Sequence, residues 1–287
     1  MNKLLGAPVV EEIHQSVREQ AERFFREKKR RPKLAVVLVG ENPASVIYTR
    51  KKGEAAVAVG MEHESIVFPG TATPGDVKAA IDKLNADPKV DGILIQRPLP
   101  HSFREEEVLH WVSPEKDVDA FHPENVGRLQ LGLDCFVSCT PAGVMEILDH
   151  YGVNPSGKVA CVIGRSSIVG KPMATLLLQA NATVLHTHSK TPDIKAVCRM
   201  ADIVVVAVGK PEMVDSSYLK PGAVVIDVGI NRIDDPRAPK GTRIVGDVNY
   251  NDAARVASAI TPVPGGVGPM TIAMLLQNTM HAAEKRG

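Results

Sequence analysis

A tyrosine and a lysine spaced four residues apart are the first candidates for chemistry in this chain. Tyr48 and Lys52 lie in residues 44–59, which we predict to form a helix, so their side chains share one helix face. An enclosed lysine amine can take or relay a proton near neutral pH. A solvated Tyr/Lys pair has the same spacing, so a catalytic role needs polar partners from other segments.

Such partners follow the third predicted strand, residues 92–96. Gln96 ends that strand and a Pro-Leu-Pro turn containing Leu99 comes next, at the carboxyl end where open α/β sheets bind ligands. A glutamine there needs a partner, and a lysine ammonium or a substrate oxygen would serve. Asp117 and Asp119 face alike if their segment is extended, although either one alone is equally typical of a turn or a helix cap.

A glycine-rich turn, residues 164–172, joins a predicted strand to a predicted helix and offers free backbone N–H groups to a phosphate. Gly164 and Gly170 alone are a weak signal, because the turn departs from G-x-G-x-x-G. NAD sites place an acidic residue about 20 positions later, whereas residues 186–190 read His-Thr-His-Ser-Lys. Arg165 can pair with a 2′-phosphate and Ser189 can donate a hydroxyl, so the sequence favours NADP over NAD.

A second unusual loop lies near the end of the chain. Residues 261–271, TPVPGGVGPMT, contain three prolines and three glycines and lead into a predicted helix. Proline stiffens the path and glycine lets the backbone approach a ligand closely. We therefore expect a binding loop here in preference to a plain connector.

Composition narrows the classes of function. Lys+Arg 34 against Asp+Glu 33 leaves a formal charge of +1, so the chain lacks the basic excess of nucleic-acid-binding proteins. No apolar run approaches the roughly 20 residues that cross a bilayer, and we expect a cytoplasmic protein that binds no membrane. The four cysteines form no C-x-x-C pair, and His186 and His188 have no nearby third ligand, so we expect no disulfide and no metal site.

The elements that position these residues alternate short β-branched runs with helical patterns, which predicts an α/β fold with parallel sheets. We expect two α/β domains with a cleft between them, the second a Rossmann-like doubly wound parallel sheet. The predicted boundaries assign residues 1–141 plus 268–287 to the first domain and residues 142–267 to the second. Residues 233–242 read as a polar surface loop. The predicted strands are 34–40, 65–68, 92–96, 158–164, 182–188, 203–209 and 223–229.

In chain order, these segments resemble the bifunctional methylenetetrahydrofolate dehydrogenase/methenyltetrahydrofolate cyclohydrolase family. The resemblance covers nearly the whole chain, from about residue 32 to the final helix. Each motif is modest evidence, whereas their combination in this order is highly specific. The segments that carry it are residues 48–52, 92–96 with 98–100, 116–119, 139–141, 164–166 with 169–172, and 261–271.

The resemblance implies oxidation of 5,10-methylene- to 5,10-methenyltetrahydrofolate with NADP, then hydrolysis to 10-formyltetrahydrofolate in the same cleft, as part of one-carbon metabolism. It also implies a homodimer. The first domain would bind folate and the second NADP. Lys52 would be the catalytic lysine of the hydrolysis, with Gln96 adjusting its hydrogen bonding. Tyr48 would stack on the folate, and Asp119 would accept two hydrogen bonds from the pterin.

The resemblance also assigns the remaining site residues. Arg165 and the turn at Gly164 would hold the 2′-phosphate side of NADP, and Leu99 would border the substrate. The residues that would line the nicotinamide and ribose are Thr140, Ser166, Ser189 and Ile230. Those that would border the aminobenzoyl part of the folate are Pro264, Gly265 and Gly266.

Four positions depart from the family pattern. Arg97 replaces an apolar residue after Gln96, Ala120 replaces the usual glycine after Asp119, Ser138 replaces a proline, and Gly6 begins an atypical N-terminus. Arg97 adds a charge near Gln96, so we hypothesise that it alters the cyclohydrolase activity and leaves the dehydrogenase intact.

Two alternatives remain open at this point. One is an NADP-dependent dehydrogenase of another small substrate, with the two-domain layout of shikimate dehydrogenase. Tight folate binding would discriminate against it. The other is a non-catalytic folate-binding protein, against which the joint presence of Lys52, Gln96 and Asp119 argues.

Overall fold

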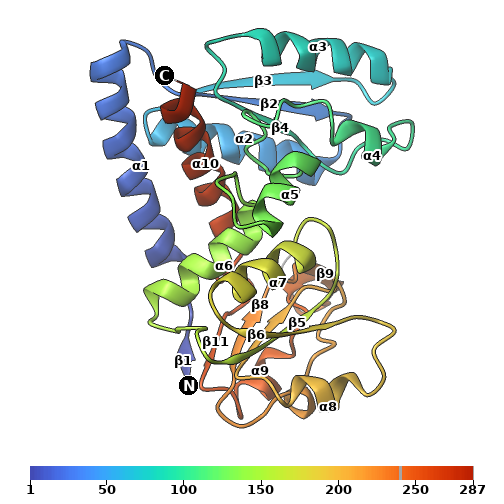
Figure 1. Cartoon of the computed structure of the whole chain (residues 1–287). Coiled ribbons are helices and arrows are strands. Elements are labelled where there is room, and N and C mark those ends of the chain that lie inside the picture. Colours follow the sequence, from blue (N-terminus) through green and yellow to red (C-terminus); the bar gives the residue numbers. More distant parts are fainter. Residues whose placement is uncertain (239–240, 287) are drawn as a thin grey trace. The chain divides into compact units, whose positions relative to one another are not determined.

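The computed structural model describes residues 1–238 and 241–286 of the chain, which divides into two compact units. The first unit comprises Met1–Glu11 with Cys139–Thr271, and the second comprises Glu12–Ser138 with Ile272–Gly287. Two helices, α1 (Gly6–Lys28) and α10 (Met270–Arg286), begin in the first unit and continue in the second (Figure 1). Both units are mixed α/β, so the predicted fold class is confirmed.

The second unit contains a three-stranded parallel sheet in the order β3-β2-β4. The central strand, β2 (Lys33–Val39), is almost entirely buried, which explains its unbroken apolar sequence. The neighbouring strands are β3 (Glu62–Phe68) and β4 (Gly92–Ile95). The helices of this unit, besides those shared with the first, are α2 (Pro43–Ala58), α3 (Pro74–Ala86), α4 (Glu105–Val108) and α5 (Pro123–Gln130).

Helix α2 begins where its sequence predicts. The Asn42 side chain accepts hydrogen bonds from the backbone N–H groups of Ala44 and Ser45, and Pro43 takes the first helical position, where its missing N–H costs nothing. Together these residues fix the start of the helix that carries Tyr48 and Lys52.

The first unit contains a six-stranded sheet in the order β1-β11-β8-β7-β5-β6, with parallel pairing throughout. This is the expected Rossmann-like arrangement. Its strands are β1 (Asn2–Lys3), β5 (Val159–Ile163), β6 (Thr183–Thr187), β7 (Ile203–Val206), β8 (Val224–Asp227) and β11 (Ala259–Ile260). Its helices are α6 (Cys139–His150), α7 (Gly170–Gln179), α8 (Ile194–Cys198), the 3-10 helix η1 (Ser216–Tyr218) and α9 (Tyr250–Ala253).

The predicted polar loop at residues 233–242 is wrong at its ends. β9 (Asn231–Asp234) and β10 (Thr242–Val245) pair antiparallel and form a small separate sheet. Half-buried and exposed residues alternate along both strands because one face of this sheet is covered. The polar sequence of these residues does not show the hydrophobic alternation from which such strands are predicted. Residues 239–240 of the predicted loop lie outside the described residues.

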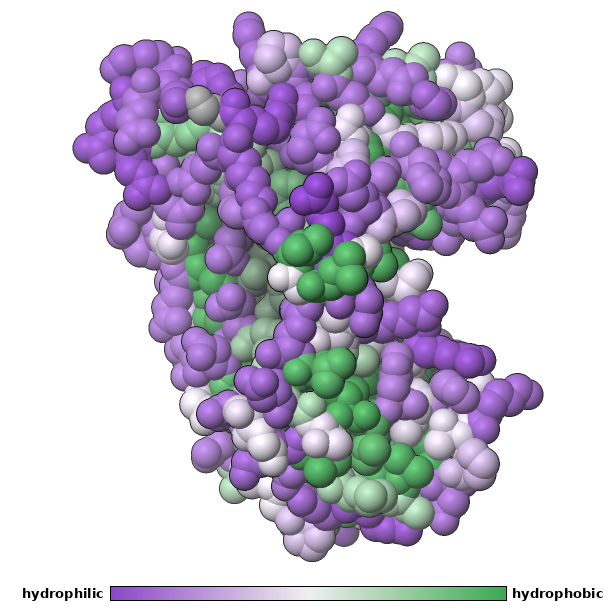
Figure 2. All heavy atoms as spheres, viewed as in Figure 1, coloured by the Kyte–Doolittle hydropathy of each residue, from purple (hydrophilic) through white to green (hydrophobic). Residues whose placement is uncertain are grey.

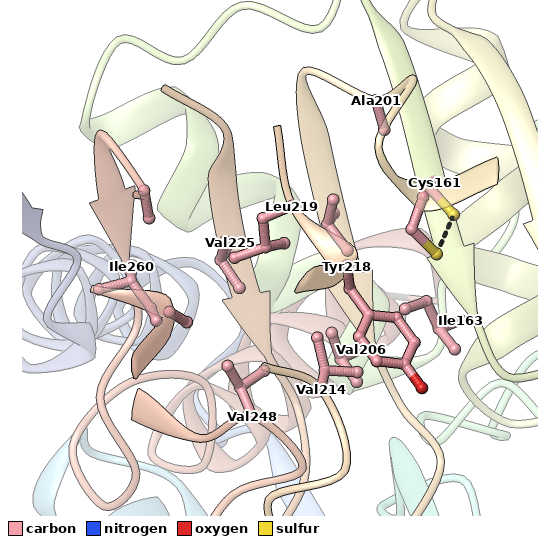
Figure 3. Packing of buried hydrophobic residues seen from close by; sticks show 14 residues of the cluster. Cys161, Ile163, Ala201, Val206, Val214, Tyr218, Leu219, Val225, Val248 and Ile260 are labelled. Carbon is pink, nitrogen blue, oxygen red and sulfur yellow. Dashed lines mark hydrogen bonds between the residues drawn. The ribbon is translucent and has the colours of Figure 1, made fainter. Parts of the chain in front are cut away.

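Aliphatic side chains from the sheet strands fill the core of the first unit. Figure 3 shows Ile163, Val206, Val225 and Ile260 converging from four strands. Cys161 and Cys198 are buried in the same cluster with their Sγ atoms 3.6 Å apart. Such a core holds the strand ends rigidly, which is what a site built at those ends requires.

Hydrophilic side chains cover most of the second unit on the face drawn in Figure 2, at the top of that view. Among the described helices, none combines the length and the hydrophobicity that crossing a bilayer requires.

Candidate active site

Lys52 and Gln96 form the most specific contact in the second unit. The Lys52 ammonium donates a 2.9 Å hydrogen bond from Nζ to Gln96 Oε1, and the lysine is only 7% exposed. The Gln96 side-chain Nε2 donates to the backbone carbonyl of Arg97 at 2.7 Å, so the amide can present only its oxygen to the lysine. The expected pairing of these two residues is present.

The sheet explains why two residues 44 positions apart meet. β4 pairs with β2, and the Gln96 N–H continues that ladder by donating to Val37 O at 2.8 Å. Helix α2 packs on the same sheet and carries Lys52 on a buried position. The Ser45 hydroxyl also reaches the carbonyl of Arg97 at 3.4 Å, which links the start of α2 to the turn after β4.

Tyr48 precedes Lys52 by one helical turn and is 40% exposed, so its ring is available to a ligand on that side of α2. Leu99, in the turn after β4, packs against a buried apolar cluster of the second unit. The backbone around both residues is therefore fixed, while the ring of Tyr48 is not enclosed by the protein.

Asp119 borders a small pocket in the second unit. Arg97 forms part of its wall, with its guanidinium 5.3 Å from the ring centroid of Phe121 and Nη1 3.0 Å from Glu105 Oε2. The charge introduced at Arg97 is thus partly balanced by Glu105 and lies beside the pocket of Asp119. The pocket is lined by Ile93, Ile95, Arg97, Val108, Leu109, Val112, Asp117, Asp119, Phe121 and His122.

The neighbouring Asp117 has a different task from Asp119. It is buried, and its Oδ2 accepts hydrogen bonds from the N–H of His122 at 2.7 Å and from Asn125 Nδ2 at 3.1 Å. Burial, with a smaller contribution from the nearby Asp119 charge, raises the pKa of Asp117 to about 6. Asp117 therefore organises the start of α5, although both aspartates line the pocket.

The sequence did not predict the buried, structural role of Lys116. Its side chain is fully buried, and Nζ donates to the carbonyls of Leu84 at 2.8 Å and Asp87 at 2.6 Å. Burial lowers its pKa to about 8. A lysine beside two aspartates reads in sequence as a solvated charge run, and no sequence signal distinguishes it from one.

Two glycines fix the backbone of the turn at residues 164–172 in the first unit. Gly164 has a φ of +120°, and a Cβ at Gly170 would lie 2.6 Å from the carbonyl carbon of Gly164. Only glycine fits at both positions. Ser166 Oγ accepts from the N–H groups of Val169 and Gly170, both at 3.2 Å, which orders the turn at the start of α7.

The carboxyl ends of the parallel strands bring the other predicted cofactor residues to one edge of this sheet. Arg165, Ser166 and Ser189 are exposed, and Ile230 is 54% exposed in the segment after β8. His186 Nε2 lies 2.8 Å from the carbonyl oxygen of Gly164, so that imidazole supports the turn. In the described chain no group of three or more His, Cys, Asp or Glu side chains is placed to hold a metal ion.

The loop at residues 261–271 is tied to the start of α1. Gly265 has a φ of +107°, and its carbonyl accepts the N–H of Gly6 at 2.9 Å. A side chain at Gly6 would overlap the carbonyl of Gly266. Gly6, which departs from the family pattern, therefore lies where the backbone at the start of α1 contacts the backbone of this loop. At the end of this loop Thr271 contacts Thr140, with hydroxyl oxygens 3.3 Å apart.

The predicted site residues thus form two sets, one in each unit. The second unit holds Tyr48, Lys52, Gln96, Leu99 and Asp119. The first unit holds Thr140, Gly164, Arg165, Ser166, Ser189, Ile230, Pro264, Gly265 and Gly266.

Two family models match this chain. Residues 4–119 match the catalytic domain of tetrahydrofolate dehydrogenase/cyclohydrolase, and residues 138–287 match its NAD(P)-binding domain. Among curated relatives, the bifunctional protein FolD of Acetivibrio thermocellus is 54% identical over 88% of this chain and 87% of its own length. The protein of the same name from Chlorobium phaeovibrioides is 49% identical over 98% of this chain and 97% of its own length.

Solved structures agree with the family models. The bifunctional methylenetetrahydrofolate dehydrogenase/cyclohydrolase FolD of Campylobacter jejuni is 43% identical, with a TM-score of 0.94 over 100% of both chains. The Trypanosoma brucei enzyme, solved with NADP cofactor and an inhibitor, is 40% identical, with a TM-score of 0.93 over 98% of this chain and 96% of its own. The chain therefore belongs to the tetrahydrofolate dehydrogenase/cyclohydrolase family.

Proposed function

We propose that this chain oxidises 5,10-methylenetetrahydrofolate to 5,10-methenyltetrahydrofolate with NADP and then hydrolyses the product to 10-formyltetrahydrofolate. The observation that carries the proposal is the enclosed Lys52–Gln96 hydrogen bond of 2.9 Å. Membership of the family supports this activity over a shikimate-dehydrogenase-like one, and the enclosed lysine supports an enzyme over a binding protein.

In the hydrolysis, water adds to the methenyl carbon and loses a proton, and the bond from that carbon to N5 then breaks to leave the 10-formyl group. Lys52, as the neutral amine, would accept or relay the proton that the water loses, because its Nζ is held at one defined position on a buried face of α2. Gln96 would orient the lysine, since its own amide is fixed by the carbonyl of Arg97. Tyr48 would stack on the folate, and Asp119 would accept hydrogen bonds from the pterin.

The oxidation needs no side-chain base, because it transfers a hydride between two positioned rings. NADP, when bound, accepts that hydride. The exposed Arg165 and the glycine-constrained turn at Gly164 fit a 2′-phosphate, and no carboxylate stands at residues 186–190 to repel it. Thr140, Ser166, Ser189 and Ile230 would line the nicotinamide and ribose.

The remaining substrate contacts are proposed by resemblance. Leu99 would border the substrate in the second unit. Pro264, Gly265 and Gly266 would border the aminobenzoyl group, and the positive φ of Gly265 supports a close backbone approach there. The division of labour proposed for the chain is folate binding by residues 1–141 plus 268–287 and NADP binding by residues 142–267.

A direct assay tests the proposal. The purified chain is mixed with 5,10-methylenetetrahydrofolate and either NADP or NAD, while reduced cofactor and methenyl-folate are followed by absorbance. We expect faster reduction of NADP than of NAD, and decay of methenyl-folate faster than in an enzyme-free control. Absence of reduction with both cofactors would remove the dehydrogenase assignment.

We also propose a cytoplasmic homodimer, which the family resemblance supports. Light scattering coupled to size-exclusion chromatography tests the oligomer, because a dimer has twice the 30.8 kDa mass of one chain. A single-chain mass at assay concentration would contradict it.

A further inference from the structure

Two buried carboxylates lie beyond the strand ends of the first unit, in addition to the residues discussed above. Asp227 is the last residue of β8, and Asp247 follows β10 by two positions. Asp247 is fully buried and Asp227 is 3% exposed. Burying a carboxylate is unfavourable unless several donors satisfy it, so the donors show what each residue holds in place.

Asp247 joins two loops. Its Oδ2 accepts the backbone N–H groups of Val208 at 2.7 Å and Gly209 at 2.8 Å, in the loop after β7. Its Oδ1 accepts the side-chain amide of Asn231 at 2.8 Å, in the segment after β8. Both loops leave the sheet at the carboxyl ends of parallel strands.

Asp227 in turn fixes Asp247. Its Oδ1 accepts the N–H groups of Asp247 and Gly229, both at 2.9 Å, and its Oδ2 accepts the N–H of Val248 at 2.9 Å. Glycines make room for the pair. A Cβ at Gly229 would lie 2.5 Å from the backbone nitrogen of Asp247, and a Cβ at Gly246 would overlap the Asp227 carboxylate.

This hydrogen-bond network holds the residues on both sides of Ile230. Gly229 before it is held by Asp227, and Asn231 after it is held by Asp247. The loop after β7 meets the phosphate turn, because a Cβ at Gly164 would lie 2.9 Å from the carbonyl carbon of Ala207. Asp247 therefore links the Ile230 segment to the loop that packs against the turn.

We propose that Asp247, acting through Asn231, is a positioning residue that fixes the Ile230 segment for the nicotinamide half of the cofactor. The inference rests on the proposed dinucleotide site of the first unit. The residue touches no reacting atom itself. It acts through two loops, so its loss should weaken binding of the nicotinamide half more than binding of the adenine half.

The test compares Asn231→Ala and Asp247→Ala in the full chain. We expect each variant to raise the KM for NADP about tenfold, the effect of losing one charge-assisted hydrogen bond. In Asn231→Ala, which leaves the contacts of Asp247 with the loop after β7 intact, the dissociation constant of 2′,5′-ADP, which lacks the nicotinamide, should stay within about twofold of the unchanged chain. Hydrolysis of methenyl-folate without NADP should do the same, because Lys52 and Gln96 belong to the second unit.

Asp202→Ala is the matched control. Asp202 also accepts a backbone N–H, from Val159 at 2.8 Å, and pairs with Lys220, but it precedes β7 at the amino end of the same sheet. Its loss should lower the free energy of unfolding without changing the KM for NADP. Circular dichroism checks the fold, and Asn231→Ala decides the matter alone if Asp247→Ala does not fold.

Three results would overturn the inference. They are a KM for NADP within about twofold of the unchanged chain in Asn231→Ala, an equal weakening of 2′,5′-ADP, and the same rise in KM in Asp202→Ala. If the unchanged chain does not reduce NADP, the proposed function is overturned, and the inference, which rests on it, falls as well.

Discussion

Replacing Gly170 by alanine places a methyl group inside the turn that follows β5. The new Cβ would lie 2.6 Å from the carbonyl carbon of Gly164 and 2.9 Å from Arg165 Cα, where ordinary contacts begin at 3.4 Å. The new Cβ would also overlap the carbonyl oxygen of Gly164. All three neighbours are backbone atoms, so the turn itself must shift, by roughly 1 Å, to restore ordinary contact. Overpacking of this kind costs about 1–3 kcal/mol.

A dinucleotide that requires the undistorted turn must restore it on binding. The affinity for NADP should therefore fall roughly 5- to 150-fold, the equivalent of 1–3 kcal/mol. Titration calorimetry with NADP measures the loss, and the KM for NADP in the dehydrogenase assay should rise in parallel. Hydrolysis of methenyl-folate should be unchanged, because Lys52 and Gln96 lie in the second unit.

Gly127→Ala provides the control for Gly170→Ala. Gly127 lies within α5, and nothing approaches its Cβ position within 4 Å. Alanine there should raise the free energy of unfolding by about 0.5–1 kcal/mol and change neither activity. Unaltered NADP affinity in Gly170→Ala would refute the assignment of the turn to the cofactor.

Three further predictions concern the second unit. Ala120 has a φ of +60°, so Ala120→Gly should raise the free energy of unfolding by about 0.5–1 kcal/mol in urea denaturation, and a loss would contradict the strain argument. Burial lowers the pKa of Lys116 from 10.5 to about 8, so between pH 8 and pH 10.5 the unfolded chain binds more protons than the folded one. The free energy of unfolding should therefore rise by about 3 kcal/mol as the pH increases across this range. Lys116→Met should lack that rise, and equal pH slopes for both proteins would exclude it. Arg97→Leu should change the cyclohydrolase rate at least about threefold and spare the dehydrogenase, since Arg97 lines the pocket of Asp119; equal turnover of the variant and the unchanged chain in both assays would sink this idea.

The parallel sheets could be predicted because strands buried on both faces read as continuous apolar runs, as in residues 34–39. The start of the helix carrying Lys52 is marked in the sequence by the asparagine that caps it and the proline that opens it. By contrast, β1 consists of Asn2 and Lys3, and it exists only because β11 offers it an edge to pair with. Two polar residues carry no strand pattern, so tertiary pairing overrides local preference there.

Site residues could be predicted where they belong to a sequence motif. They could not be predicted where only the fold brings them together. Helical spacing pointed to Lys52 and the end of a predicted strand pointed to Gln96, while their contact depends on how α2 packs on the sheet. Asp227 and Asp247 belong to no recognisable motif, because most of their partners are backbone N–H groups, which every residue except proline carries. The glycine expected at residue 120 has a physical reason in the positive φ found there.

The measurement that tests the central claim most directly is methenyl-folate hydrolysis by Lys52→Met, beside Lys51→Met as the matched control. Lys51 is the adjacent lysine of α2 and is exposed. Lys52→Met should lose at least about 100-fold in hydrolysis, the usual contribution of a positioned proton-transfer group, while it still binds folate. Lys51→Met should hydrolyse methenyl-folate as fast as the unchanged chain. Undiminished hydrolysis by a folded Lys52→Met would contradict the account.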